Sequence, residues 1–219
     1  MQTEMKWVDL ARSPNLAGAI IHFTDSKDAR WAGALFLPAH VPLPSYPIAY
    51  NDIYIIQGQL IEKGGLVHSA ETFLSRRTDA GLNAGPQGAV LFVYRDRSVR
   101  SDTQVTMPAS TLEWHPGAAP GITVAPLYAT DHLLTLVAWE PGTQMHLHDH
   151  PTGEEIFVLS GELRDQNGRY PVGTWQRLYP GTKHRPYTET KTRILLRNGH
   201  LRPSASCNRA RRICAARFS

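Results

Sequence analysis

Short apolar runs separated by turn residues make up most of this chain. The clearest runs are rich in β-branched and aromatic residues, which favour strands. They span residues 53–56, 89–94, 133–139, 156–159 and 193–196. Between such runs, Gly64-Gly65 and Asn167-Gly168 predict hairpin turns. Many short strands with closely spaced turns are typical of an all-β barrel or sandwich.

One stretch has a different period. Residues 66–77 place apolar side chains at the spacing of an amphipathic helix. The stretch also belongs to an internal repeat whose second copy has the character of a strand. The repeat therefore favours a strand here, and the 17 glycines and 16 prolines spread along the chain argue against long helices.

The chain repeats itself after about one hundred residues. Residues 38–60 match residues 141–163 at a constant offset of 103, and residues 70–73 match residues 172–175 at an offset of 102. A repeat of this length is too long for a solenoid unit and has the size of a small domain. We therefore expect two copies of one domain, over residues 1–100 and 115–200, with the boundary in the mostly polar stretch 98–116.

The second copy contains a group of metal-binding residue types. Its spacing is Gly142, five residues, His148, one residue, His150, three residues, Glu154, six residues and Gly161; His184 follows a Pro180-Gly181 turn. Residues i and i+2 of a strand share a face, so His148 and His150 should point together into a barrel interior. Glu154 has the same parity, and the later turn would bring His184 from another strand.

Three imidazoles and one carboxylate form a suitable ligand set for one divalent transition metal. Zinc is the expected ion, and iron, manganese, nickel and copper are alternatives. His146 shares the parity of His148 and His150. Two interpretations of His146 stay open: a pocket residue that orients a ligand, and an exposed loop residue.

The first copy lacks these ligands. The positions that match His148, His150 and Glu154 are Ser45, Pro47 and Asn51, and His184 maps to Gly81 or Leu82. Proline and leucine side chains carry no ligand atom, so no metal is expected in the first copy.

Net charge and cysteine usage set the C-terminal segment apart. The formal net charge of the whole chain is +4, and the segment 201–219 alone carries five arginines and no acid. Both cysteines, Cys207 and Cys214, also lie in this segment. We interpret it as a disordered basic tail, because it lacks the interleaved aromatic residues of a nucleic-acid site and the apolar face of a membrane helix. A disulfide scaffold is excluded for the rest of the chain.

Targeting signals are not evident. The chain has no run of 18 apolar residues, and its N-terminal residues lack the apolar stretch of a secretory signal. The expectation is a cytoplasmic protein that does not enter a membrane. The dinucleotide-binding, P-loop and HExxH patterns are also absent.

The pattern G-x5-H-x-H-x3-E-x6-G followed by P-G-x2-H resembles the metal signature of the cupin superfamily. Residues 150–163 and 170–187 are similar to the ChrR-type cupins, which include the C-terminal domain of zinc-dependent anti-sigma factors. The resemblance covers roughly residues 1–200. It implies an all-β fold of two tandem cupin (double-stranded β-helix, jelly-roll) barrels, with a metal at His148, His150, Glu154 and His184.

The resemblance leaves two functions open. One is a regulatory module that senses a small-molecule ligand. A sigma factor is not an expected partner of this module. The sigma-binding part of the family is a separate N-terminal helical domain with its own His and Cys zinc ligands, whereas this chain has no cysteine before Cys207. The alternative is an Fe(II)-dependent dioxygenase that cleaves a small diketone or hydroxyketone, with Glu155 as a candidate general base. A homodimer is expected in either case, because small barrels leave sheet edges to cover.

Overall fold

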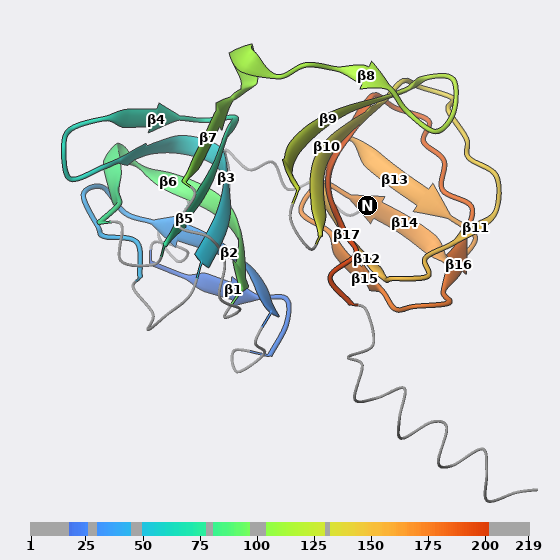
Figure 1. Ribbon diagram of the computed structural model, residues 1–219, viewed down its shortest axis with the longest axis horizontal. Helices are drawn as coiled ribbons and strands as arrows, with labels where there is room; N and C mark the ends of the chain where they lie inside the picture. Colours follow the sequence, from blue (N-terminus) through green and yellow to red (C-terminus); the bar gives the residue numbers. More distant parts are fainter. Residues whose placement is uncertain are drawn as a thin grey trace, which may run out of the picture. The chain divides into compact units, whose positions relative to one another are not determined.

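The computed structural model describes residues 18–25, 30–44, 50–77, 81–96, 104–129 and 132–201. Ser45, Pro47 and the tail from residue 202 onward lie outside the described residues. The contacts divide the chain into two compact units, Met1–Leu112 (unit 1) and Glu113–Ser219 (unit 2). Within the described ranges the fold is all-β, and none of its helices has the length and apolar character needed to cross a membrane (Figure 1).

Unit 1 is built on one antiparallel sheet. Its strand order is β1-β2-β6-β3-β5-β7, and β4 pairs with β3 beside this path. The elements are β1 (Ile20–His22), β2 (Arg30–Leu37), β3 (Tyr50–Ile61), β4 (Val67–Ser69), β5 (Thr72–Arg77), β6 (Asn83–Asp96), β7 (Val105–Pro108) and the 3-10 turn η2 (Ala109–Thr111). Residues 66–77 therefore form strands, as the repeat predicted, and the hairpin turn at Gly64-Gly65 is confirmed.

Unit 2 has a main sheet and two smaller ones. The main sheet has the order β15-β12-β17-β10-β9-β8, and β11 pairs with β16 and β13 with β14. The strands are β8 (His115–Pro116), β9 (Ile122–Ala129), β10 (Leu133–Trp139), β11 (His148–Asp149), β12 (Glu154–Ser160), β13 (Glu162–Asp165), β14 (Gly168–Pro171), β15 (Trp175–Leu178), β16 (Lys183–His184) and β17 (Thr192–Asn198). All five apolar runs singled out in the sequence lie within strands. The second predicted hairpin is also present, with Gln166 and Asn167 between its paired strands.

The internal repeat corresponds to one strand order used twice. The order β1-β2-β6-β3-β5 of unit 1 and the order β9-β10-β17-β12-β15 of unit 2 follow the sequence offset. Gly58 and Gly161 are equivalent and have positive φ angles of 77° and 73°. A Cβ atom there would lie 2.1 Å from the Gly88 oxygen and 2.4 Å from the Lys191 oxygen, and these two neighbours are again 103 residues apart.

Each unit has its own apolar core, and the two cores use equivalent positions. The inward-facing residues at matching positions are Leu35, Ile53, Ile55, Leu91 and Val93 in unit 1 and Val137, Ile156, Val158, Ile194 and Leu196 in unit 2. Side chains of a strand alternate between faces, so each strand gives one face to this interior. The repeated apolar pattern therefore specifies the same inner wall in both units.

The stretch expected to be a linker contains a strand of unit 1. β7 pairs with β5 between Thr72 and Pro108 and between Ser75 and Val105. The buried Arg76 also donates hydrogen bonds to the Val105 carbonyl and the Thr106 hydroxyl, both at 2.6 Å. Unit 1 therefore extends beyond residue 100, because the long side chain of Arg76 holds a segment distant in sequence.

Candidate metal centre

Three histidines converge at one end of unit 2. His148 and His184 are opposite each other in the β11–β16 pair, and His150 follows β11 directly. The ring centroids are 4.8 to 4.9 Å apart, and one nitrogen from each ring lies within 4.8 Å of the others. Figure 1 shows this strand pair at the edge of unit 2 opposite β9 and β10. The i, i+2 spacing and a separate strand thus bring together three of the four predicted ligands.

Each Nδ1 atom of the triad has an oxygen atom nearby. The Nδ1 atom of His148 lies 3.0 Å from the His146 carbonyl oxygen, that of His150 lies 3.4 Å from Glu154 Oε2, and that of His184 lies 3.5 Å from Asp165 Oδ2. The Nε2 atom of His150 and both ring nitrogens of His184 are buried and have no hydrogen-bond partner among the described residues. Leaving such atoms unpaired costs about 1–3 kcal/mol each. This donor set fits a metal ion that accepts one lone pair from each of the three rings.

Glu154 lies at the edge of the histidine cluster. It is buried at the start of β12, and its Oε2 is 3.4 Å from His150 Nδ1. Its carboxylate is not part of the group whose donor atoms all lie within 4.8 Å of one another. The structure therefore places Glu154 next to the triad without bringing it into the same cluster.

Burial affects the protonation of His184. Desolvation, with a further contribution from nearby His150, lowers the pKa of His184 below the usual value for histidine. Its imidazole is only 2% exposed. The neutral form is the one that binds a metal, so the surroundings of His184 favour ligation.

A cavity of about 350 Å³ opens beside the histidines. Its walls are largely apolar and come from strands on several sides of unit 2, including Val137, Trp139, Ile156 and Ile194. None of the described residues that line it is Lys or Arg. A small molecule in this cavity would contact both the apolar wall and any metal held by the triad.

His146 and Glu155 do not line this cavity. The His146 side chain is exposed, and the residue contributes its carbonyl to His148 instead. Glu155 is fully buried on the other face of β12, where it accepts a 2.6 Å hydrogen bond from Arg177 and lies 3.2 Å from His200. Burial raises the pKa of Glu155, but the His200 hydrogen bond and the charges of Arg197 and Arg177 outweigh it, and the pKa is lowered. Glu155 is therefore a paired carboxylate, and its position does not support the general-base role.

The equivalent place in unit 1 holds different side chains. Asn51, which matches Glu154, is buried and accepts a 3.2 Å hydrogen bond from Arg95 Nε. The Arg95 guanidinium also lies 4.5 Å from the centre of the Trp31 ring. Arg95 corresponds to Asn198, which lines the cavity of unit 2. Unit 1 thus places a fixed cation beside the equivalent of Glu154.

Two further residues next to the triad escaped the sequence analysis. Asp165, the last residue of β13, and Gln166, in the β13–β14 turn, contact the segment around His184. The only signal for them was the hairpin turn at Asn167-Gly168, which indicates a bend and not a function.

Comparisons with known proteins agree with this architecture. The chain is similar to a Cupin 2 conserved barrel domain protein from Leptotrichia buccalis (15% identity, TM-score 0.54, 82% of this chain and 88% of the other). It is also similar to a putative dioxygenase from Nostoc punctiforme (13%, 0.64, 85% and 74%) and to quercetin 2,3-dioxygenase from Acinetobacter baumannii (12%, 0.58, 91% and 84%). At such identities these likenesses show the fold alone, which is that of the cupin barrels.

A family model is more specific for the second half of the chain. The model of the ChrR cupin-like domain matches residues 102–202. The chain therefore contains a ChrR-type cupin domain, which includes all of the histidine cluster. The match begins shortly before β7, although β7 pairs within unit 1. No curated protein sequence matches the chain.

Proposed function

We propose that unit 2 holds one divalent transition metal through His148, His150, His184 and Glu154 and senses a small-molecule ligand that binds beside it. The observation that carries this proposal is the pair of buried, unpartnered Nε2 atoms in a histidine triad that opens on a cavity. To complete the ligand set, the Glu154 side chain would rotate from its 3.4 Å contact with His150 Nδ1 toward the three rings. Zinc is the ion we expect.

Unit 1 would be a second cupin barrel whose metal site has been lost. Its strand order, the positive φ of Gly58 and its inner apolar wall all match unit 2. The Asn51–Arg95 pair supports the loss of the site, because a guanidinium beside the former ligand position repels a metal cation. The homodimer and the cytoplasmic location stay predictions from the sequence.

An Fe(II)-dependent dioxygenase is the second candidate. The cavity beside the histidines would admit a small diketone or hydroxyketone, and two of the fold relatives carry dioxygenase names. Bound iron would supply the oxygen chemistry. The residues of this chain would hold the substrate in the apolar cavity and keep bulk water from it.

Metal analysis of the purified protein tests both candidates. Wild type, His148→Ala and His146→Ala should be compared by plasma mass spectrometry, because His146 is an exposed neighbour whose side chain does not enter the cluster. About one zinc per chain in wild type and His146→Ala, its loss in His148→Ala, and no oxygen consumption with diketones would support the sensor. About one iron per chain with oxygen uptake would support the dioxygenase. No metal in any of the three after incubation with zinc or iron would overturn the site.

A further inference from the structure

The backbone on both sides of His184 is held by one side chain from the β13–β14 turn. Gln166 donates a hydrogen bond from Nε2 to the Lys183 carbonyl at 3.1 Å. Its Oε1 accepts from the Arg185 N–H at 3.0 Å. A single amide thus replaces a neighbouring strand along the exposed edge of β16. His184 lies between the two contacts, so they restrain its backbone from both sides.

The ring of His184 faces Asp165, which precedes Gln166 and ends β13. Asp165 Oδ2 lies 3.5 Å from His184 Nδ1, which has no hydrogen-bond partner among the described residues, and both side chains are 2% exposed. The other carboxylate oxygen of Asp165, Oδ1, accepts three hydrogen bonds: from the Asn167 N–H at 2.7 Å, the Gly168 N–H at 3.2 Å and the Tyr170 hydroxyl at 2.8 Å. Three donors on Oδ1 fix the plane of the carboxylate, and Oδ2 therefore keeps its direction toward the imidazole.

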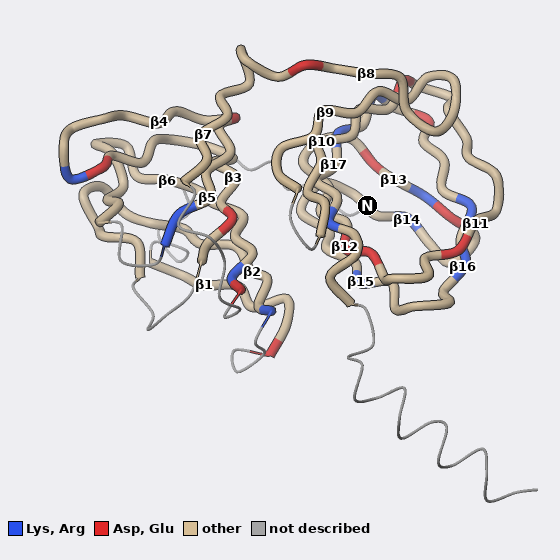
Figure 2. The backbone as a smooth tube through the Cα atoms, viewed as in Figure 1, with Lys and Arg blue, Asp and Glu red and all other residues tan. Residues whose placement is uncertain are grey.

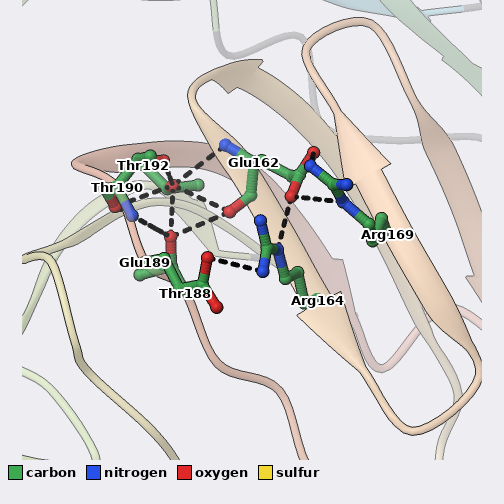
Figure 3. A network of polar contacts seen from close by, with 7 residues as sticks. All are labelled: Glu162, Arg164, Arg169, Thr188, Glu189, Thr190 and Thr192. Carbon is green, nitrogen blue, oxygen red and sulfur yellow. Dashed lines mark hydrogen bonds and ion pairs between the residues drawn. The ribbon is translucent and has the colours of Figure 1, made fainter. Parts of the chain in front are cut away.

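The strand that carries Asp165 is anchored to the chain that follows His184. Arg164 and Tyr187 exchange backbone hydrogen bonds of 2.9 and 2.8 Å. At the start of β13, the Glu162 carbonyl accepts from the Thr188 and Thr192 hydroxyls, and the Glu162 carboxylate pairs with Arg164 and Arg169 (Figure 3). Figure 2 shows acidic and basic positions following one another along β13. The register of Asp165 against His184 is thus fixed on both sides.

We propose that Asp165 is the positioning residue for His184: its carboxylate accepts the Nδ1–H proton of the imidazole and so directs the Nε2 lone pair toward His148 and His150. This inference rests on the proposed metal site. Carboxylates that accept from the outer nitrogen of a ligand histidine select its tautomer, and their loss typically weakens metal binding 10- to 100-fold. Gln166 supports the same geometry through the backbone.

The substitution Asp165→Asn gives a sharp test, because its geometry is predictable. The Asn167, Gly168 and Tyr170 donors require an oxygen at the Oδ1 position, so the new NH₂ group must occupy the Oδ2 position. It then donates to His184 Nδ1 and leaves the proton on Nε2. We expect zinc binding, measured by competition with a chromophoric chelator, to weaken 10- to 100-fold.

A spectroscopic measurement separates positioning from a structural effect. The ¹⁵N NMR spectrum of metal-free protein, recorded at about pH 8, above the ordinary histidine pKa of about 6.5, should show the Nδ1–H tautomer of His184 in wild type. It should show the Nε2–H tautomer in Asp165→Asn. An Nε2–H tautomer in wild type would overturn the proposal, even if the variant fails to fold.

Two matched controls complete the experiment. Asp149→Asn removes the same charge from an exposed residue at the cavity without a contact to a histidine nitrogen in the structure, and should weaken zinc binding less than about threefold. Tyr170→Phe removes one donor to Oδ1 and should keep the Nδ1–H tautomer. Equal zinc affinity in Asp165→Asn and Asp149→Asn would overturn the role of Asp165. If wild type binds no zinc, the proposed function fails, whereas the tautomer measurement still decides the role of Asp165.

Discussion

The interiors of unit 1 and unit 2 are lined by equivalent strands but hold different polar side chains at one end. Both inner walls are formed by apolar residues at equivalent positions of the same strand order. At one end, however, unit 1 pairs Asn51 with Arg95, whereas unit 2 has Glu154 opposite Asn198. The same place therefore holds a guanidinium in unit 1 and the carboxylate beside the histidine cluster in unit 2. The difference between the units comes from a few positions at this end, because their apolar inner walls are alike.

A second corner shows the same contrast. Glu62 and Asp165 are equivalent acids, and each accepts a hydrogen bond from an equivalent partner, His68 or Tyr170. In unit 1 the carboxylate of Glu62 turns to Arg76, which holds β7. In unit 2 the carboxylate of Asp165 turns to His184. One acidic position thus stabilises an extra strand in one unit and a candidate metal ligand in the other.

The largest effect is expected from copying unit 1 into unit 2. Asn198→Arg would place a guanidinium opposite Glu154, as Arg95 stands opposite Asn51. The new cation would pair with the carboxylate of the proposed ligand Glu154 and repel a divalent ion, so zinc affinity should fall more than about 100-fold. Chelator competition measures this, and Asn198→Gln is the control of similar size. Unchanged zinc affinity in Asn198→Arg would show that the Glu154–Asn198 end of unit 2 is not comparable with the Asn51–Arg95 end of unit 1.

The Arg95 guanidinium should contribute to the folding stability of unit 1. Arg95→Met keeps most of the side-chain volume but leaves the buried Asn51 oxygen without its donor and removes the cation from the Trp31 ring. We expect a loss of about 2–4 kcal/mol in the free energy of unfolding, measured by urea titration. Lys in place of Arg95 should recover part of this loss. A variant as stable as wild type would mean that unit 1 does not depend on its internal cation.

The equivalent glycines should respond alike in the two units. Gly58→Ala and Gly161→Ala each place a Cβ atom on a residue with positive φ, within 2.4 Å of a carbonyl oxygen. Each should lower the free energy of unfolding by about 1–3 kcal/mol. Gly64→Ala, where no atom lies within 4 Å of the new Cβ, is the control. A loss of unfolding free energy in only one of the two variants would argue that Gly58 and Gly161 are not structurally equivalent.

The smallest effect concerns pH and Glu62. Burial raises the pKa of Glu62, but the hydrogen bonds from His68 and Arg76 outweigh it, and the pKa is lowered. A lowered folded-state pKa stabilises the protein above the unfolded value of about 4.3 and loses this effect as pH falls through the folded pKa. Glu62→Gln should therefore cost under about 1 kcal/mol at pH 7, and the difference from wild type should narrow as the pH falls below about 4. Urea titrations at several pH values measure it; a constant difference would contradict the assignment.

Local features of the sequence determined much of the architecture. Apolar runs of strand length, glycine turns and the offset of 103 residues predicted the strands, both hairpins and the repeated strand order. The i, i+2 spacing of His148 and His150 predicted a shared face. All of these depend on residues close in sequence or on a comparison of two segments, so no knowledge of distant contacts was needed.

Only the tertiary structure decided which distant residues meet. Arg95 beside Asn51, Asp165 beside His184 and β7 on the sheet of unit 1 each join segments that are 19 to 44 residues apart. Glu154, correct in parity, still lies outside the histidine cluster. Strand parity specifies a face but not the depth or rotamer of a side chain on it, and contacts across a barrel depend on the packing of every strand between them.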